Sequence, residues 1–123
     1  MKITLNPSAK DAAVRDALVA EGGFGKYYTD HMVICEWTEK NGWAEPELIP
    51  YGPISLDPAT AVFHYGQEIF EGMKAYRQPD GGIALFLPEA NALRFAKSAA
   101  RLALPEMPEE LFLETVEALV KQD

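Results

Sequence analysis

The pattern of apolar residues predicts short strands in the middle of this chain and helices near its beginning and its end. The clearest strand candidate is segment 31–37, which is short, apolar, rich in β-branched residues and flanked by turn formers. The next turn ends in Asn41-Gly42, a pair that readily takes positive φ in hairpins, so residues 43–49 should return as a partner strand. Pro46 places this partner near a sheet edge, because proline cannot donate to the ladder.

The sequence predicts helices over residues 8–22, 88–103 and 109–121, and a shorter helix that starts at Pro58. Ser8 should cap the first helix, and Asp57 the short one. The range 88–103 is the strongest, because it opens with Pro88-Glu89 and has an alanine-rich interior.

Residues 63–77 fit no single period, since apolar, charged and glycine residues are mixed there. The part from 63 to 70 is typical of the wall of a site. From Gly72 the pattern suits a strand, and the turn at 78–82 should lead into a second strand at 83–87. We therefore expect a hairpin that is entered through an irregular, aromatic-rich corner.

Composition narrows the classes of function. The chain has 123 residues, the length of one domain, and its 48% hydrophobic content is that of a globular protein. A net charge of -8 argues against nucleic acid and anionic membranes as partners. No apolar run reaches the roughly 18 residues of a membrane span. Cys35 is the single cysteine, so no disulfide can form within the chain, and we expect a reducing, cytoplasmic setting.

The usual signatures of metal and nucleophile chemistry do not occur in the sequence. His31 and His64 are the only histidines, and neither has the spacing of a metal site. The sequence also has no glycine-rich phosphate loop and no Gly-x-Ser-x-Gly elbow. We therefore expect no metal.

The expected helix 88–103 carries a basic stripe, because Arg94, Lys97, Ser98 and Arg101 follow helical spacing. Arginine offers a fork of donors that matches phosphate oxygens, so a small anion is one candidate ligand. A solvated face is the other interpretation, and composition alone favours it. The apolar residues of the helix are expected on a different stripe, made of Leu93, Ala96, Ala100 and Ala103.

Several separated blocks resemble the branched-chain amino acid aminotransferases, which are fold-type IV enzymes that use pyridoxal 5'-phosphate (PLP). The blocks are Phe24-Gly25-Lys26-x-x-Thr29-Asp30-His31-Met32, His64-Tyr65-Gly66-x-Glu68-x-Phe70-Glu71-Gly72-Met73-Lys74-Ala75-Tyr76-Arg77, Asn91-Ala92-x-Arg94 and Ser98-Ala99-x-Arg101-Leu102. The resemblance covers the chain from about Gly22 onward. It implies an α+β fold with a small antiparallel sheet packed against helices in two layers, the N-terminal domain of the D-amino acid aminotransferase-like fold.

Site residues follow from the resemblance by position. Arg94 matches the arginine that holds the cofactor phosphate, and Phe24, Tyr65 and Phe70 match aromatics around the substrate side chain. An apolar pocket suits leucine, isoleucine and valine, which would exchange their amino group with 2-oxoglutarate. The tyrosine that Tyr65 matches reaches the active site of the other subunit, so a homodimer is implied.

The resemblance also implies that residues 1–123 are the small N-terminal domain alone. The lysine that bonds PLP lies in a larger second domain of these enzymes, and Lys74 matches a position that is not catalytic. We therefore expect no catalytic residue here, no activity of this chain alone, no PLP binding by it, and self-association through uncovered apolar surface. Two alternatives stay open: a relative such as a D-amino acid transaminase or aminodeoxychorismate lyase, and a stand-alone binding module.

Overall fold

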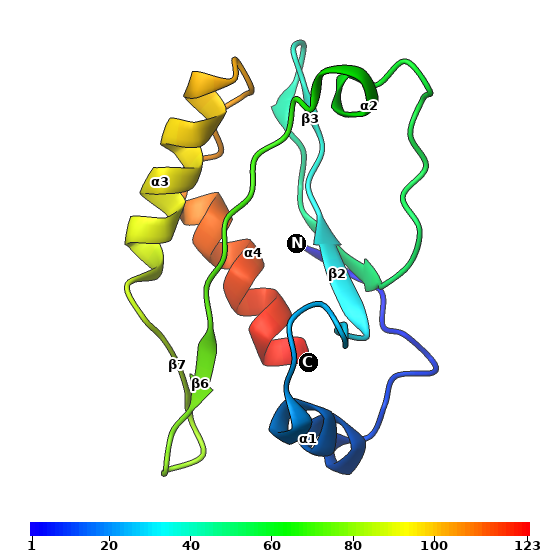
Figure 1. The fold of residues 1–123 in the computed structure, drawn as a ribbon, viewed down its shortest axis with the longest axis vertical. Helices are drawn as coiled ribbons and strands as arrows, with labels where there is room; N and C mark the ends of the chain where they lie inside the picture. Colours follow the sequence, from blue (N-terminus) through cyan, green and yellow to red (C-terminus); the bar gives the residue numbers. More distant parts are fainter. The chain divides into compact units, whose positions relative to one another are not determined.

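The structure is a computed structural model that describes all residues, Met1–Asp123. It divides into two compact units, which are described separately. Unit 1 consists of residues 1–53 and 117–123, and unit 2 of residues 54–116. Both helices and strands are present, with the strands in small sheets, so the α+β class is confirmed (Figure 1).

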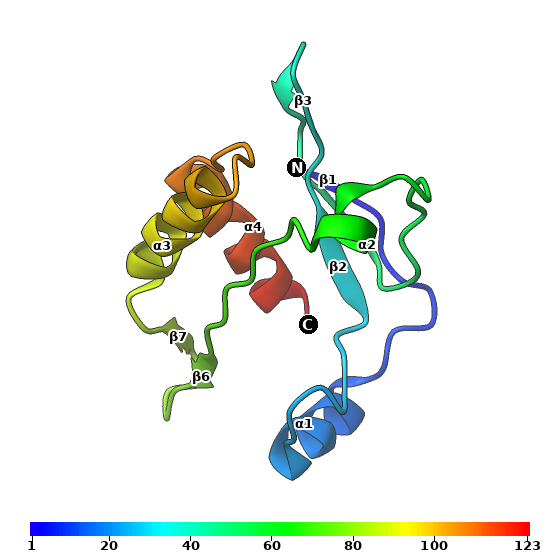
Figure 2. The ribbon, with the colours of Figure 1, turned by 45° about the horizontal axis from the view of Figure 1, so that its top comes forward.

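Unit 1 is built on a three-stranded sheet with the strand order β1-β5-β2. The strands are β1 (Lys2–Ile3), β2 (His31–Ile34) and β5 (Glu47–Pro50). β2 and β5 are antiparallel partners, as the sequence predicts, and Val33 lies opposite Leu48. β1 joins the other side of β5 in parallel, with Ile3 opposite Leu48 (Figure 2).

The predicted edge position of this strand is wrong, because β5 is the central strand. Pro46 lies one residue before β5, and its carbonyl accepts a hydrogen bond from the Lys2 N–H at 3.0 Å. The ladder therefore uses only the acceptor of Pro46, and its missing N–H costs nothing.

The predicted turn at Asn41-Gly42 is confirmed, but it closes a separate small hairpin. β3 (Trp37–Thr38) pairs with β4 (Gly42–Trp43), and Trp37 lies opposite Trp43. Gly42 has a φ of 70°, which glycine adopts without steric cost. The predicted strand 31–37 is therefore divided between two sheets.

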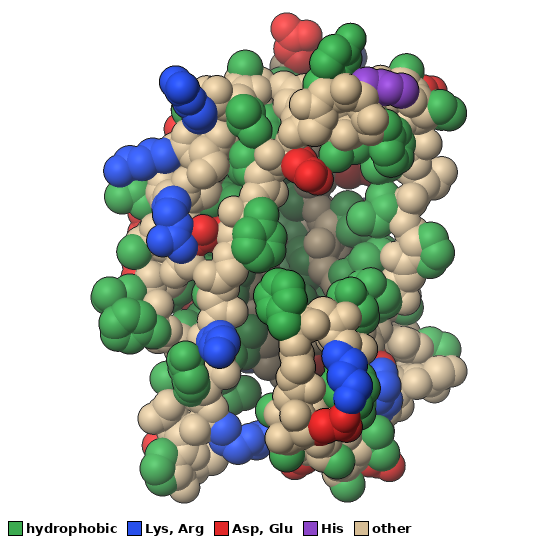
Figure 3. All heavy atoms as spheres, in the orientation of Figure 1, with side chains coloured by type: hydrophobic (Ala, Val, Ile, Leu, Met, Phe, Trp, Pro, Cys, Tyr) green, Lys and Arg blue, Asp and Glu red, His purple; other side chains and the backbone are tan.

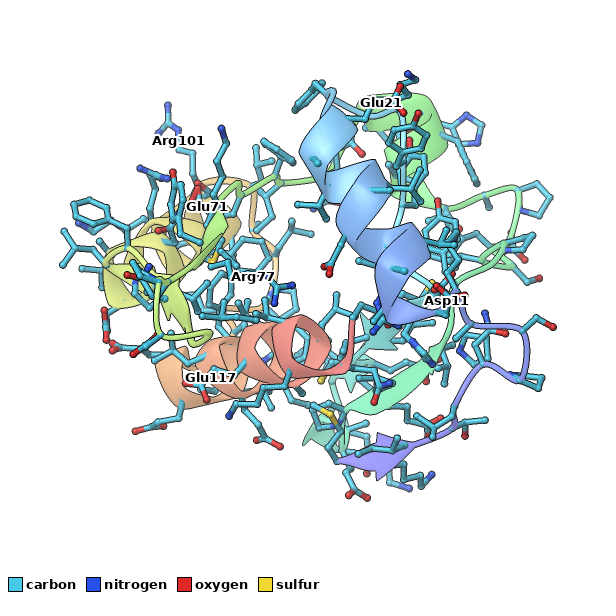
Figure 4. The ribbon with its side chains drawn as sticks, turned by 90° about the horizontal axis from the view of Figure 1, so that it is seen from below. Asp11, Glu21, Glu71, Arg77, Arg101 and Glu117 are labelled. Carbon is cyan, nitrogen blue, oxygen red and sulfur yellow. The ribbon has the colours of Figure 1, made fainter.

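Helix α1 (Ala12–Glu21) begins later than predicted. Asp11, not Ser8, is its N-cap, since the Asp11 carboxylate accepts a hydrogen bond from the Val14 N–H at 2.9 Å. Gly22 ends the helix, as expected. Asp11 and Glu21 mark the two ends of α1 in Figure 4.

Leu48 and His31 are the largest fully buried side chains of unit 1. The His31 ring accepts a hydrogen bond from the Asn6 N–H at Nε2 (2.8 Å), so Nδ1 carries the ring proton and donates a hydrogen bond to Asp123 Oδ1 (2.7 Å). The other carboxylate oxygen of Asp123 accepts the His31 N–H at 2.8 Å. Both ring nitrogens are thus satisfied, which allows this polar side chain to be buried.

Unit 2 contains a short helix, a hairpin and a long helix, and it shares the last helix with unit 1. The elements are α2 (Ala61–Tyr65), β6 (Ala75–Arg77), β7 (Ile83–Leu85), α3 (Pro88–Arg101) and α4 (Glu109–Gln122). The predicted hairpin is confirmed, with Tyr76 opposite Ala84. Both long helices are confirmed to within two residues.

Two predictions in unit 2 are wrong. The short helix begins at Ala61 and not at Pro58, because Asp57 forms a turn in which its carboxylate accepts the Ala59 N–H at 2.7 Å. The buried residues of α3 are Ala92 and Ala99, not the predicted apolar stripe, of which Leu93 is 54% exposed. Phe95 and Phe112 pack within unit 2 with ring centroids 5.3 Å apart.

No helix in the structure is both long enough and apolar enough to cross a membrane.

Candidate anion-binding site

Helix α3 presents the basic stripe, and its sequence explains why the helix begins where it does. Leu87 precedes the helix with a φ of 47°, and Pro88 occupies the first turn, where its missing N–H has no intrahelical partner to lose. Glu89 lies in the first turn and Arg101 in the last, as the helix dipole prefers. The stripe therefore lies on a well-formed helix of 14 residues.

A buried carboxylate holds the first cation of the stripe. Arg94 donates from Nε to Glu71 Oε1 at 2.8 Å and from Nη2 to Glu71 Oε2 at 2.7 Å. The Glu71 side chain is only 9% exposed, whereas that of Arg94 is 65% exposed. This bidentate contact fixes the plane of the guanidinium group.

Asn91 supports the carboxylate from the preceding turn of α3. Its side-chain amide donates to Glu71 Oε2 at 2.5 Å and to the Gly72 carbonyl at 3.0 Å. Arg94 holds the pKa of the Glu71 carboxyl below its usual value, with a smaller lowering from Asn91, while burial acts in the opposite direction. The same contact raises the pKa of Arg94, so both groups are charged at neutral pH.

Arg94 lines a hollow of about 480 Å³. Its lining residues are Ile69, Phe70, Arg94, Lys97, Ser98, Arg101 and Leu102. Figure 3 shows Lys and Arg side chains gathered over α3, and in Figure 4 the Arg101 side chain points outward on the same side as Glu71. The predicted basic stripe is thus confirmed as one surface.

The hollow offers the chemistry that a small anion requires. Lys97 and Arg101 carry charges that no carboxylate among the lining residues neutralises, and Ser98 adds a hydroxyl donor. Arg94 keeps three N–H donors after its two hydrogen bonds to Glu71. Ile69 and Phe70 add an apolar wall, so this surface can also contact an apolar group attached to the anion.

The structure brings together only some of the predicted site residues. Phe70 and Arg94 line the same hollow. Tyr65 is the last residue of α2 and is 85% exposed, outside the residues that line the hollow. Phe24 belongs to unit 1 and is fully exposed.

Sequence reasoning assigned no role to Glu71 or Asn91, although both lie in the blocks that carry the resemblance. Asn91 lies three residues before Arg94, and this spacing alone places the two on one helix face. Glu71 lies 23 residues before Arg94, and no local pattern connects the two. Only the tertiary structure identifies this contact.

Comparison with known proteins finds similar curated proteins. No protein-family model matches the chain. A probable branched-chain-amino-acid aminotransferase of Streptomyces coelicolor is 54% identical over 123 residues, which cover 98% of this chain and 34% of that protein. The branched-chain-amino-acid aminotransferase of Mycolicibacterium smegmatis is 54% identical over 98% of the chain and 33% of its own length.

The mitochondrial branched-chain-amino-acid aminotransferase of Saccharomyces cerevisiae is 44% identical over all of this chain and 30% of its own length. The chain thus spans about a third of the length of the curated relatives that it matches. The resemblance inferred from the sequence blocks is confirmed: over nearly its whole length this chain is similar to branched-chain-amino-acid aminotransferases, and it aligns with about a third of each.

Proposed function

We propose that this chain is the small N-terminal domain of a transaminase that moves an amino group between leucine, isoleucine or valine and 2-oxoglutarate through PLP. The observation that carries the proposal is the 54% identity over 98% of the chain to proteins named as branched-chain-amino-acid aminotransferases. The coverage of about a third of those proteins supports a domain that works together with a larger one.

The hollow on α3 fits the phosphate of PLP. Arg94 presents unused donors there, and Lys97, Ser98 and Arg101 add two charges and a hydroxyl. We assign Arg94 as the phosphate-binding residue of the cofactor. When bound, PLP supplies an electron sink that stabilises negative charge at the substrate Cα.

Three aromatic side chains are proposed to select the substrate. Phe70 lies beside Arg94 in the hollow, so it would be close to a cofactor held there. Phe24 and Tyr65 are exposed here, and such large apolar groups at the surface are available to face another domain or subunit. An apolar wall rewards a branched aliphatic side chain for leaving water and offers nothing to a charged one.

The wider assembly is also part of the proposal. A homodimer in which Tyr65 enters the active site of the partner subunit would cover this side chain. The specific fold is proposed as the N-terminal domain of the D-amino acid aminotransferase-like fold, with the sheet and helices in two layers. The single cysteine supports a reducing, cytoplasmic location.

The proton transfers of the reaction need a lysine from outside this chain, and we propose that the chain alone is inactive. This chain would then bind the phosphate, orient the cofactor and shape the substrate pocket. None of these roles requires a catalytic residue among residues 1–123.

The test uses the complete natural protein. We expect visible absorbance from bound PLP and transfer of the amino group from leucine, isoleucine and valine to 2-oxoglutarate. Arg94→Ala should weaken PLP binding by about tenfold or more, the loss expected when at least one charged hydrogen bond is removed. Lys40→Ala is the control, because Lys40 lies in an exposed turn and its removal should leave PLP binding unchanged. Activity only with D-amino acids, or a lyase activity, would replace this proposal, and a protein that never binds PLP would favour a stand-alone binding module.

A further inference from the structure

The Glu71 and Arg94 pair places a carboxylate beside a hollow that is otherwise lined by cations, and this placement needs an explanation. Glu71 is nine-tenths buried, so its carboxylate has lost most of its hydration. Arg94 is largely exposed, and pairs with an exposed partner contribute little to stability. The pair also cancels a positive charge beside a hollow whose other charged groups are cationic.

The geometry gives the explanation. Glu71 occupies the edge of the guanidinium formed by Nε and Nη2. The opposite edge, formed by Nη1 and the second hydrogen of Nη2, remains free and has the same forked shape. Because two hydrogen bonds fix the plane of the group, they also fix the direction of the free edge.

Asn91 makes the carboxylate a fixed support. Its two amide hydrogens connect Glu71 Oε2 to the Gly72 carbonyl, which lies in the same chain segment as Glu71. The Gly72 carbonyl therefore anchors the Asn91 side chain, and Asn91 in turn holds the Glu71 carboxylate that Arg94 contacts. An arginine with four side-chain torsions would otherwise lose much rotational freedom when it binds an anion.

We propose that Glu71, held by Asn91, is a positioning residue that directs the free edge of Arg94 toward a phosphate monoester in the hollow on α3. This inference rests on the proposed function, in which that ester is the phosphate of PLP. Glu71 does not touch the ligand and acts only through Arg94.

A positioning role and a purely electrostatic role of Glu71 predict opposite changes in phosphate affinity when Glu71 is made neutral. Glu71→Gln raises the net charge near the hollow by one, so a purely electrostatic role predicts tighter binding of a phosphate ester. A positioning role predicts weaker binding by about tenfold, the size expected for one charge-assisted hydrogen bond. Glu68→Gln is the matched control, since Glu68 is an exposed residue of the same segment and gives the same charge change.

The experiment measures the dissociation constants of PLP and of pyridoxal, which lacks the phosphate, for the complete natural protein. We expect Glu71→Gln to weaken PLP binding about tenfold and to leave pyridoxal binding unchanged. Asn91→Ala should also weaken PLP binding, although alanine favours the helix. In an Arg94→Ala background, Glu71→Gln should cause no further loss, because its effect passes through Arg94.

Equal or tighter PLP binding by Glu71→Gln, in a wild-type protein that binds PLP, overturns the positioning role and leaves the proposed function intact. An equal loss for PLP and pyridoxal also overturns it, because the defect would then be in folding. A wild-type protein that binds no PLP overturns both proposals.

Discussion

Replacing Leu48 with alanine should cost a large part of the stability of unit 1. Leu48 is 1% exposed and lies in the central strand of the three-stranded sheet. The change removes three buried carbon atoms at about 0.8 kcal/mol each, and the cavity left behind adds to this. We expect a loss of about 3 kcal/mol, against a typical total of about 5–15 kcal/mol.

Ile3→Ala is the matched control for this change. Ile3 lies directly opposite Leu48 in the ladder and also loses three carbon atoms, but it is 62% exposed. Since only about a third of its surface leaves water, the expected loss is about 1 kcal/mol. The two substitutions therefore differ mainly in burial.

Denaturation in urea, followed by tryptophan fluorescence, measures both losses. Trp37 and Trp43 pair with each other in unit 1, so the signal reports on the unit that contains Leu48. The free energy of unfolding should fall about three times as much for Leu48→Ala as for Ile3→Ala. Equal losses would refute the assignment of Leu48 to the core of this sheet.

Other predictions concern acid stability, the cofactor and association. Lys10, chiefly by a hydrogen bond, lowers the pKa of the Asp30 carboxyl below 3.8, so the ionised carboxylate stabilises the fold above about pH 4 and this stabilisation is lost as the pH falls. Asp30→Asn should therefore destabilise the protein at pH 7 and reduce the difference in unfolding free energy between pH 7 and pH 3. An unchanged difference would contradict this. The 123-residue chain alone should show no heat of PLP binding by isothermal titration, and tight binding would contradict the need for a second domain. The same chain should self-associate because Tyr65, Phe70 and Phe86 are each at least 75% exposed, and a constant monomeric mass by light scattering over a wide concentration range would count against this.

Local features were predictable from the sequence because their causes lie within a few residues. Pro88 and the alanine-rich run define α3, and Asn41-Gly42 defines a hairpin turn through the positive φ of glycine. The spacing of Arg94, Lys97, Ser98 and Arg101 predicted one surface because a helix repeats every 3.6 residues. The cap of α1 lies three residues after the predicted Ser8, since Ser8 and Asp11 both have capping side chains and the hydrogen bond to the Val14 N–H selects Asp11.

The sequence alone determined that this chain has two long helices, two tight hairpins, one basic helical stripe and a relationship to the branched-chain-amino-acid aminotransferases. Only the tertiary structure decided that β5 is the central strand, because the parallel pairing of β1 with it joins residues 45 positions apart. It also decided that Glu71 pairs with Arg94, across 23 positions, and that His31 is buried against Asp123, across 92 positions. Such contacts depend on where distant segments meet, and hydrophobic periodicity carries information only about the face that each segment buries.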